Sequence, residues 1–151
     1  MKRCPYTKHF FERALVLSST CRISDVYYPR FDEVHPPFTD ALEAIWDTGS
    51  QVTVISDRVV KQLELRPIGQ VWMQHAKGTT LANTYKVNLI LPNQIEVPNL
   101  FVLDGEIGDT DVLLGMDVIS LGDLCITQPD EKTQLTYQTP STHKTDYTKE
   151  P

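Results

Sequence analysis

The sequence predicts a mostly-β fold: a closed barrel of hairpins in a single lobe, with one or two short helices. Strand-like segments recur along the chain, only two short stretches carry helix signals, and strands do not alternate with long helices. At 151 residues the chain has the length of one domain. We expect this domain to span residues 1–137, with its core at about 10–137. A polar, disordered tail is predicted over 138–151.

Strand signals begin near the N-terminus. Val16 and the segments 21–23 and 26–28 suggest a hairpin that ends at Pro29. Residues 29–40 are rich in Pro, Asp and Glu and are expected to form a loop. The segments 41–46 and 51–55 are both β-like and meet at a turn around Gly49. The first half of the chain therefore predicts several short strands.

The middle of the chain carries the clearest alternation of apolar and polar residues. Positions 85–91 alternate as a half-buried strand does, 92–94 supply a turn, and Pro98 in the return strand marks an edge or a bulge. Ser56 can cap a helix that ends before Pro67. A second short helix is predicted from about Met116 to Gly122.

Composition excludes several classes of function. The chain has 14 Lys and Arg against 20 Asp and Glu, a net charge of −6, which argues against a nucleic-acid partner. Its three cysteines and four histidines lack metal-ligand spacing, so no metal site is expected. No stretch is apolar enough to span a membrane, and the N-terminal apolar run is too short for a signal peptide. The sequence predicts a cytoplasmic protein without a membrane partner.

The most informative stretch is Ile45-Trp46-Asp47-Thr48-Gly49-Ser50, which with Val52 to Ile55 places a carboxylate between two apolar runs. A charged group in such a place is costly unless it is paired or used. Gly49 would let the backbone approach another chain or a substrate, in a conformation closed to other residues. The Ser50 hydroxyl could donate to Asp47 and stabilise its charged form. The Thr48 hydroxyl, pointing the other way, would need a partner of its own.

These residues resemble the catalytic loop of the aspartic proteases. Farther on, residues 112–117 resemble the second motif of the retroviral-type members, in which two apolar residues, Leu113 and Leu114, and a glycine, Gly115, lead into a short helix. The match covers about residues 10–137 and looks closest to uncharacterised prokaryotic retropepsin-like proteins. The resemblance implies a single-lobed acid-protease barrel, in which Leu113, Leu114 and Gly115 have a structural role.

The resemblance also implies a homodimer. Aspartic proteases need two carboxylates, whereas this chain holds a single Asp-Thr-Gly and is too short for a two-lobed enzyme. Retropepsins join one aspartate from each of two copies, so the partner of Asp47 would be Asp47 of a second chain, with Thr48 bracing the two loops. The implied activity is that of an aspartic endopeptidase. Water held between the carboxylates would attack a bond in a peptide or protein substrate, without a metal or cofactor.

A flap over the substrate is expected between the two motifs. Residues 71–81 lie in the corresponding place, and Ala76, Lys77 and Gly78 form its natural tip. Trp72 could pack against substrate, although an aromatic residue on a hairpin more often serves the core or a dimer interface. Where viral members carry a paired aspartate and arginine, this chain has Gln51 and Met116, so both charges are absent together.

Other interpretations of the same residues stay open. Asp47 could be a turn residue that caps local N–H groups. Asp117 would fit the first turn of a helix as a structural residue, and the acidic run 104–111 would fit a solvated loop. Two other functions are a catalytically silent dimeric module that binds peptides in the same groove, and a phosphotransfer protein of the actin-like group. The latter needs a second phosphate loop and a much longer chain.

Overall fold

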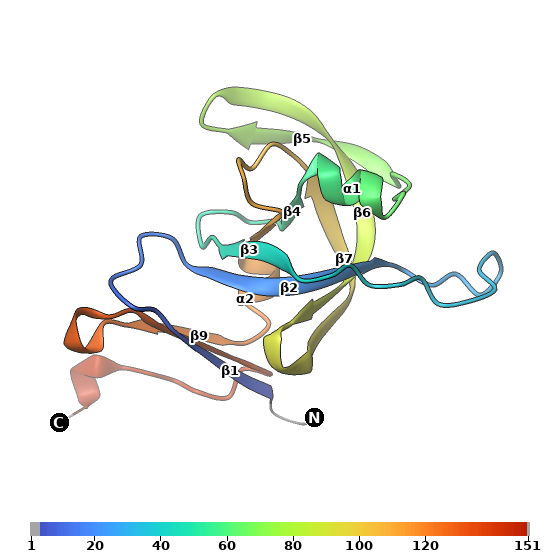
Figure 1. Cartoon of the computed structure of the whole chain (residues 1–151). Coiled ribbons are helices and arrows are strands. Elements are labelled where there is room, and N and C mark those ends of the chain that lie inside the picture. Colours follow the sequence, from blue (N-terminus) through green and yellow to red (C-terminus); the bar gives the residue numbers. More distant parts are fainter. Residues whose placement is uncertain (1–3, 151) are drawn as a thin grey trace.

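The computed structural model describes residues 4–150 and is mostly β. Along the chain its strands and helices are β1 (Cys4–His9), β2 (Ser18–Asp25), β3 (Leu42–Trp46), β4 (Val54–Ile55), α1 (Asp57–Gln62), β5 (Gly69–His75), β6 (Gly78–Leu91), β7 (Ile95–Asp104), β8 (Val112–Leu114), α2 (Met116–Ile119), β9 (Asp123–Thr127) and β10 (Gln134–Thr139). Short 3₁₀ turns lie at Pro92–Gln94, Pro129–Glu131 and Tyr147–Lys149. Figure 1 shows the two short helices against the strands.

Six strands close into a barrel, as the sequence predicts. The larger sheet has the order β2-β3-β8-β4-β7-β6-β5, and β2 also pairs with β6, so the sheet meets itself and β5 is left outside the ring. Alternation along β6 drives this closure, because Tyr85, Val87, Leu89 and Leu91 all point into the core. Closing the ring leaves these six strands without an open edge.

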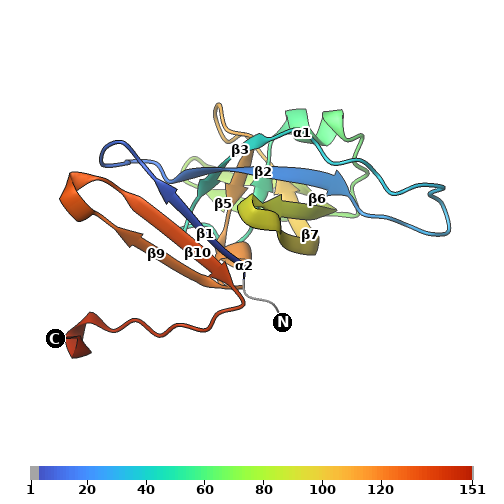
Figure 2. The same cartoon turned by 60° about the horizontal axis from the view of Figure 1, so that its bottom comes forward.

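A second sheet, ordered β1-β10-β9, packs beneath the barrel (Figure 2). Its contact with the barrel centres on Tyr137 of β10, which is 1% exposed and lies 5.0 Å, centroid to centroid, from the ring of Trp46. The Tyr137 hydroxyl donates to the carbonyl oxygen of Val118 in α2 (2.8 Å). Burial and the nearby charge of Asp123 raise the pKa of Tyr137 to about 12, so the phenol keeps its proton. The second sheet thus supports both Trp46 and α2.

The segment after β10 is fastened at Asp123. Strand β10 runs to Thr139, so the boundary expected at residue 137 lies inside a strand. The Asp123 carboxylate accepts hydrogen bonds from the side chains of Gln138 and Ser141 and from the N–H groups of Thr142 and His143. These bonds hold the pKa of Asp123 well below its usual range. The disorder expected for residues 138–151 stays a prediction.

Several local predictions can be compared with the structure. Helix α1 begins after Ser56, whose side chain accepts from the N–H of Val59, and the expected bulge lies at Pro98 and Asn99, opposite Asn88. The prediction of an N-terminal hairpin is wrong. Strand β2 is a single strand that ends at Asp25, and residues 26–28 lie outside the sheet. The strand pairs instead with β3 and β6.

The acidic segment 104–111 is less solvated than expected. Asp104 ends β7 and accepts from the side chains of Asn83 and Tyr85. Thr110 and Asp111 are 5% and 7% exposed, and Asp111 is paired with Arg58 of α1. A buried carboxylate needs such a partner. Among residues 4–150, no helix is long and apolar enough to cross a membrane.

Candidate active site

The Asp47 loop, residues 47–53, projects from one side of the barrel. Figure 1 shows it on the same side as the β5–β6 turn and the loop that precedes β2. The loop connects β3 to β4, and β8 passes between these two strands, parallel to β3 and antiparallel to β4. A loop whose two flanking strands both pair with a third one is fixed at both ends. The side chain at its start is therefore held in a defined place.

Asp47 follows directly on the buried end of β3. Trp46 is 5% exposed and its Nε1–H donates to the Ser19 hydroxyl (2.9 Å). The Asp47 N–H donates to the carbonyl oxygen of Leu114 (2.9 Å). The carboxylate itself is partly exposed, and its Oδ1 accepts from the N–H of Gly49 (2.8 Å). Asp47 thus has an anchored backbone and a carboxylate that water or another chain can reach.

Gly49 acts through close approach and not through an unusual backbone angle. Its φ lies outside the left-handed region, contrary to our expectation, but a Cβ there would sit 3.1 Å from Asp47 Oδ1. Ser50 also differs from expectation, because its hydroxyl donates to the carbonyl oxygen of Val52 (2.7 Å) and not to Asp47. Thr48 is exposed at the tip of the loop. The Gly49 N–H therefore takes the position at Asp47 that was expected for Ser50.

The first amides of α2 hold the Asp47 loop from below. The N–H of Met116 donates to the carbonyl oxygen of Ser50 (2.8 Å), and that of Asp117 donates to the carbonyl oxygen of Gln51 (3.2 Å). Amides at a helix start have no partner within the helix, so they are free to bind carbonyl groups. Backbone hydrogen bonds thus join the start of α2 to the Asp47 loop, next to the positions that carry the charge pair in viral members.

Gly115 makes this approach possible. A Cβ on Gly115 would lie 2.7 Å from both the carbonyl carbon and oxygen of Val52, and 3.0 Å from the carbonyl oxygen of Ser50. Leu114 is fully buried and Leu113 is partly buried on β8. Leu114 accepts from the Asp47 N–H, and Gly115 lies against the backbone of Ser50 and Val52. The structural role of Leu113, Leu114 and Gly115 stays a prediction.

Thr53 and Asp117 form a tie that sequence reasoning missed. Asp117 accepts from the Thr53 N–H (2.9 Å) and from the Thr53 hydroxyl (2.7 Å), which itself accepts from the Gly115 N–H (3.2 Å). Thr53 is only 1% exposed. The placement of Asp117 agrees with the structural alternative. A threonine in an apolar run and an acid one residue after Met116 were the only signals available.

Replacing the hydroxyl of Thr53 is expected to destabilise the fold. Thr53→Val keeps the shape of the side chain but leaves the Gly115 N–H without its acceptor, and Asp117 Oδ1 keeps only the hydrogen bond from the Val118 N–H. We expect the free energy of unfolding to fall by about 1–3 kcal/mol, measured by urea denaturation. Thr20→Val, at an exposed position of β2, is the control and should change it by less than about 0.5 kcal/mol. Equal stability of the two variants would contradict the role of the tie.

The β5–β6 hairpin has the form expected of a flap. Ala76 and Lys77 form its turn, and Gly78 has a φ of +129°, which other residues rarely adopt. His75 accepts from the Lys77 N–H (3.2 Å), and its Nε2 lies 2.6 Å from the Thr80 hydroxyl. Trp72 pairs across the hairpin with Leu81 and is 71% exposed. The contact of Trp72 with substrate stays a prediction.

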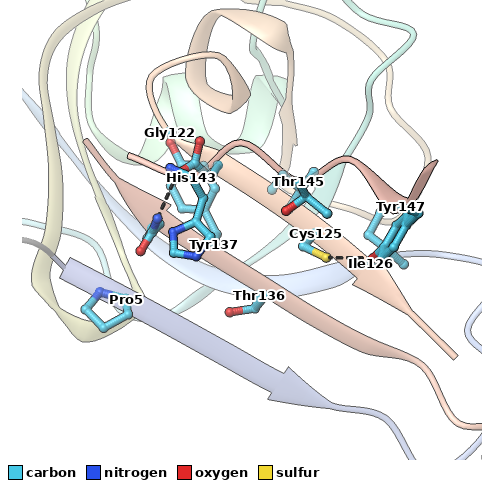
Figure 3. Close-up of a pocket in the computed structure, with 12 residues that line it drawn as sticks. Pro5, Gly122, Cys125, Ile126, Thr136, Tyr137, His143, Thr145 and Tyr147 are labelled. Atoms are coloured by element: carbon cyan, nitrogen blue, oxygen red, sulfur yellow. Dashed lines mark hydrogen bonds between the residues drawn. The ribbon is translucent and has the colours of Figure 1, made fainter. Parts of the chain in front are cut away.

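One surface pocket lies away from the Asp47 loop. An open surface pocket of about 770 Å³ lies between β9, β10 and residues 143–147 (Figure 3). Its one carboxylate, Asp123, is already occupied by four hydrogen bonds from the C-terminal segment. Within residues 4–150, no three side chains of His, Cys, Asp or Glu come together as a metal site requires. This pocket and the Asp47 loop are therefore separate features of the surface.

Comparisons with known proteins concern the same region of the chain. The family model described as gag-polyprotein putative aspartyl protease matches residues 39–120, which include Asp47 and Gly115. A retropepsin-like aspartic protease from Rickettsia conorii is 12% identical, covers 91% of this chain and 96% of its own, and has a TM-score of 0.52. EIAV protease complexed with the inhibitor HBY-793 is 16% identical and covers 69% of this chain and 85% of its own, with a TM-score of 0.49. A comparison with curated proteins gave no match.

Proposed function

Because this chain belongs to the gag-polyprotein putative aspartyl protease family, we propose that it is an aspartic endopeptidase that acts as a homodimer. Asp47 is the catalytic carboxylate, and Asp47 of a second copy completes the pair. The observation that carries this proposal is the placement of Asp47. Its backbone is tied to β8, its loop is tied to α2, and its side chain lies open at one side of the barrel. Several hydrogen bonds that position one partly exposed carboxylate suit a group that must meet its partner in a defined geometry.

The proposed mechanism uses the two carboxylates unequally. At a separation of about 3 Å both cannot carry a charge, so the pair shares one proton. The ionised member takes a proton from a water held between them, and the water attacks the peptide carbonyl carbon. The protonated member gives its proton to the carbonyl oxygen, which yields a tetrahedral diol. The Gly49 N–H, bound to Asp47 Oδ1, keeps the carboxylate oriented during this exchange.

The remaining loop residues have supporting roles in this proposal. Thr48, exposed at the loop tip, braces the loop of the partner copy, and Ser50 shapes the turn through Val52. The β5–β6 hairpin, with Ala76, Lys77 and Gly78 at its tip, closes over a peptide or protein substrate, and Trp72 contacts it. Leu113, Leu114 and Gly115 hold the loop in position. Neither a metal nor a cofactor takes part in this scheme.

A silent dimeric peptide-binding module is the second candidate. One observation favours it: the Ser50 hydroxyl does not support Asp47 in this structure. Such a module would use the same groove and the same flap but would not cleave the bound peptide. Cleavage and peptide binding must therefore be measured separately.

The dependence of the cleavage rate on enzyme concentration tests whether each copy contributes half of the active site. With a peptide library as substrate at pH 5, the rate of cleavage is expected to rise with the square of enzyme concentration at high dilution, and linearly once the dimer is saturated. The rate and the molecular mass should change over the same range of concentration, which sedimentation measures independently. Cleavage that stays proportional to enzyme concentration while the protein is monomeric would contradict the homodimer. Binding without cleavage at every concentration would favour the silent module.

A further inference from the structure

Two fully exposed apolar side chains lie in the loop between β1 and β2. Phe11 is 99% exposed and Leu15 is 100% exposed, and the adjoining Val16 is 52% exposed. Single exposed apolar residues are common, but large ones gathered in one short loop indicate an interaction surface. We call residues 10–17 the apolar loop.

The apolar loop is held firmly in this exposed arrangement. Thr133 lies directly before β10 and is 1% exposed. It accepts from the Phe10 N–H through its carbonyl oxygen (2.9 Å) and from the Ala14 N–H through its hydroxyl (2.7 Å). The Thr133 N–H donates in turn to the carbonyl oxygen of Glu12 (3.2 Å). Three hydrogen bonds to one buried residue leave the loop little freedom to turn its side chains inward. The exposure of Phe11 and Leu15 is therefore built into the fold.

The apolar loop also lies beside the Asp47 loop. Strands β2 and β3 are antiparallel, Ser18 is opposite Ile45, and the Trp46 N–H donates to the carbonyl oxygen of Leu17 (2.8 Å). The chain before Leu17 and the chain after Trp46 therefore leave the barrel at the same end of this strand pair. Figures 1 and 2 both show the apolar loop at the end of β2 opposite to the loop 26–41.

We propose that the apolar loop is a dimerisation surface, with Phe11 and Leu15 as its anchors and a second copy of this chain as its occupant. This inference rests on the proposed function, because a second copy that brings its Asp47 to the axis must also cover what lies next to it. In a twofold interface the same patch is buried on both copies, so each anchor contributes twice. Because the backbone of the apolar loop is already ordered, little conformational freedom is lost on association, and more of the free energy of apolar burial contributes to affinity.

The test compares two double variants. The first carries Phe11→Ser and Leu15→Ser, and the control carries Phe31→Ser and Val34→Ser. The control residues are 84% and 76% exposed in the loop at the other end of β2, so both variants remove similar exposed apolar groups. We expect the dimer Kd from sedimentation to rise about 30-fold or more in the first variant. The control should keep the wild-type value. Circular dichroism and urea denaturation verify that both variants fold.

The possible results separate this inference from the proposed function. If the first variant dimerises like the wild type, the inference is overturned, whereas an active wild-type dimer still supports the proposed function. A raised KM with an unchanged dimer Kd would mean that the loop contacts substrate, and would also overturn the inference. A wild type that stays monomeric at all concentrations overturns both. A wild-type dimer without cleavage, weakened by the first variant alone, supports the inference and contradicts the protease.

Discussion

Asp47→Asn is expected to lower the rate of peptide cleavage by about a thousandfold or more, the scale of loss when one member of a catalytic unit is removed. The amide cannot take a proton from the attacking water, and both half-sites of the homodimer change together. Asparagine preserves the shape of the side chain, and its amide oxygen can still accept from the Gly49 N–H, as Asp47 Oδ1 does. The fold and the affinity for peptide should therefore be kept.

The measurement pairs cleavage of a peptide library with binding of an uncleaved peptide by fluorescence anisotropy. Asp40→Asn is the matched control, because Asp40 is exposed just before β3, at the end of that strand opposite to Asp47. The control should cleave as the wild type does. Cleavage by Asp47→Asn at more than a tenth of the wild-type rate would rule out Asp47 as the catalytic group. If the wild type and Asp47→Asn bind peptide equally well and neither cleaves it, the protein is the silent peptide-binding module.

The parts of the fold that could be predicted are those where a local pattern and the tertiary structure agree. Strand β6 alternates because one of its faces lines the barrel, and α1 begins at a serine that caps it. Pro98 lacks an N–H, so a bulge in β7 was expected, and Asn99 donates there to the side chain of Asn88 (3.1 Å). In each case the chemistry of the residue favours the local structure that the tertiary fold also requires.

The second sheet could not be predicted from local patterns. Strand β10 buries Leu135 and Tyr137 among polar residues, and the residues of β9 are all partly or fully exposed. A strand with so few core residues gives too weak an alternation to identify. Its identity depends on partners far away in the chain, such as the contact of Tyr137 with Trp46.

In the candidate site, too, local features could be predicted from the sequence, whereas contacts between distant residues could not. The hairpin with Gly78 at its turn lies where the sequence predicts one, because a tight turn depends on residues that are neighbours in the chain. The close approach of Gly115 to Ser50 and Val52 depends on residues far apart in the chain. The hydrogen bond of Ser50 differs from expectation, because its hydroxyl donates to the carbonyl oxygen of Val52, and the sequence does not show which acceptor the turn brings near. The tie between Thr53 and Asp117 joins residues far apart in the chain. The two residues meet only because β8 passes between β3 and β4, and this arrangement is seen in the tertiary structure alone.

Gly115→Ala is expected to lower both stability and activity, because the added methyl group would meet backbone atoms. The Cβ would lie 2.7 Å from the carbonyl group of Val52 and 3.0 Å from the carbonyl oxygen of Ser50. Backbone atoms cannot move aside by changing rotamer, so α2 and the Asp47 loop must separate. Overpacking of this kind costs about 1–3 kcal/mol. The same displacement would stretch the bond from the Met116 N–H to Ser50.

The effect on cleavage should exceed the effect on folding. A shift of about 1 Å in a catalytic group costs on the order of a hundredfold in rate, and here the loop of each copy moves relative to the axis. Gly69→Ala is the control, because a Cβ there meets no atom within 4 Å and its stability should change by less than about 0.5 kcal/mol. Urea denaturation and the cleavage rate, both at concentrations that saturate the dimer, measure the two effects. If Gly115→Ala unfolds like the wild type and cleaves at the wild-type rate, α2 does not position Asp47, and the loop must owe its geometry to β8 alone.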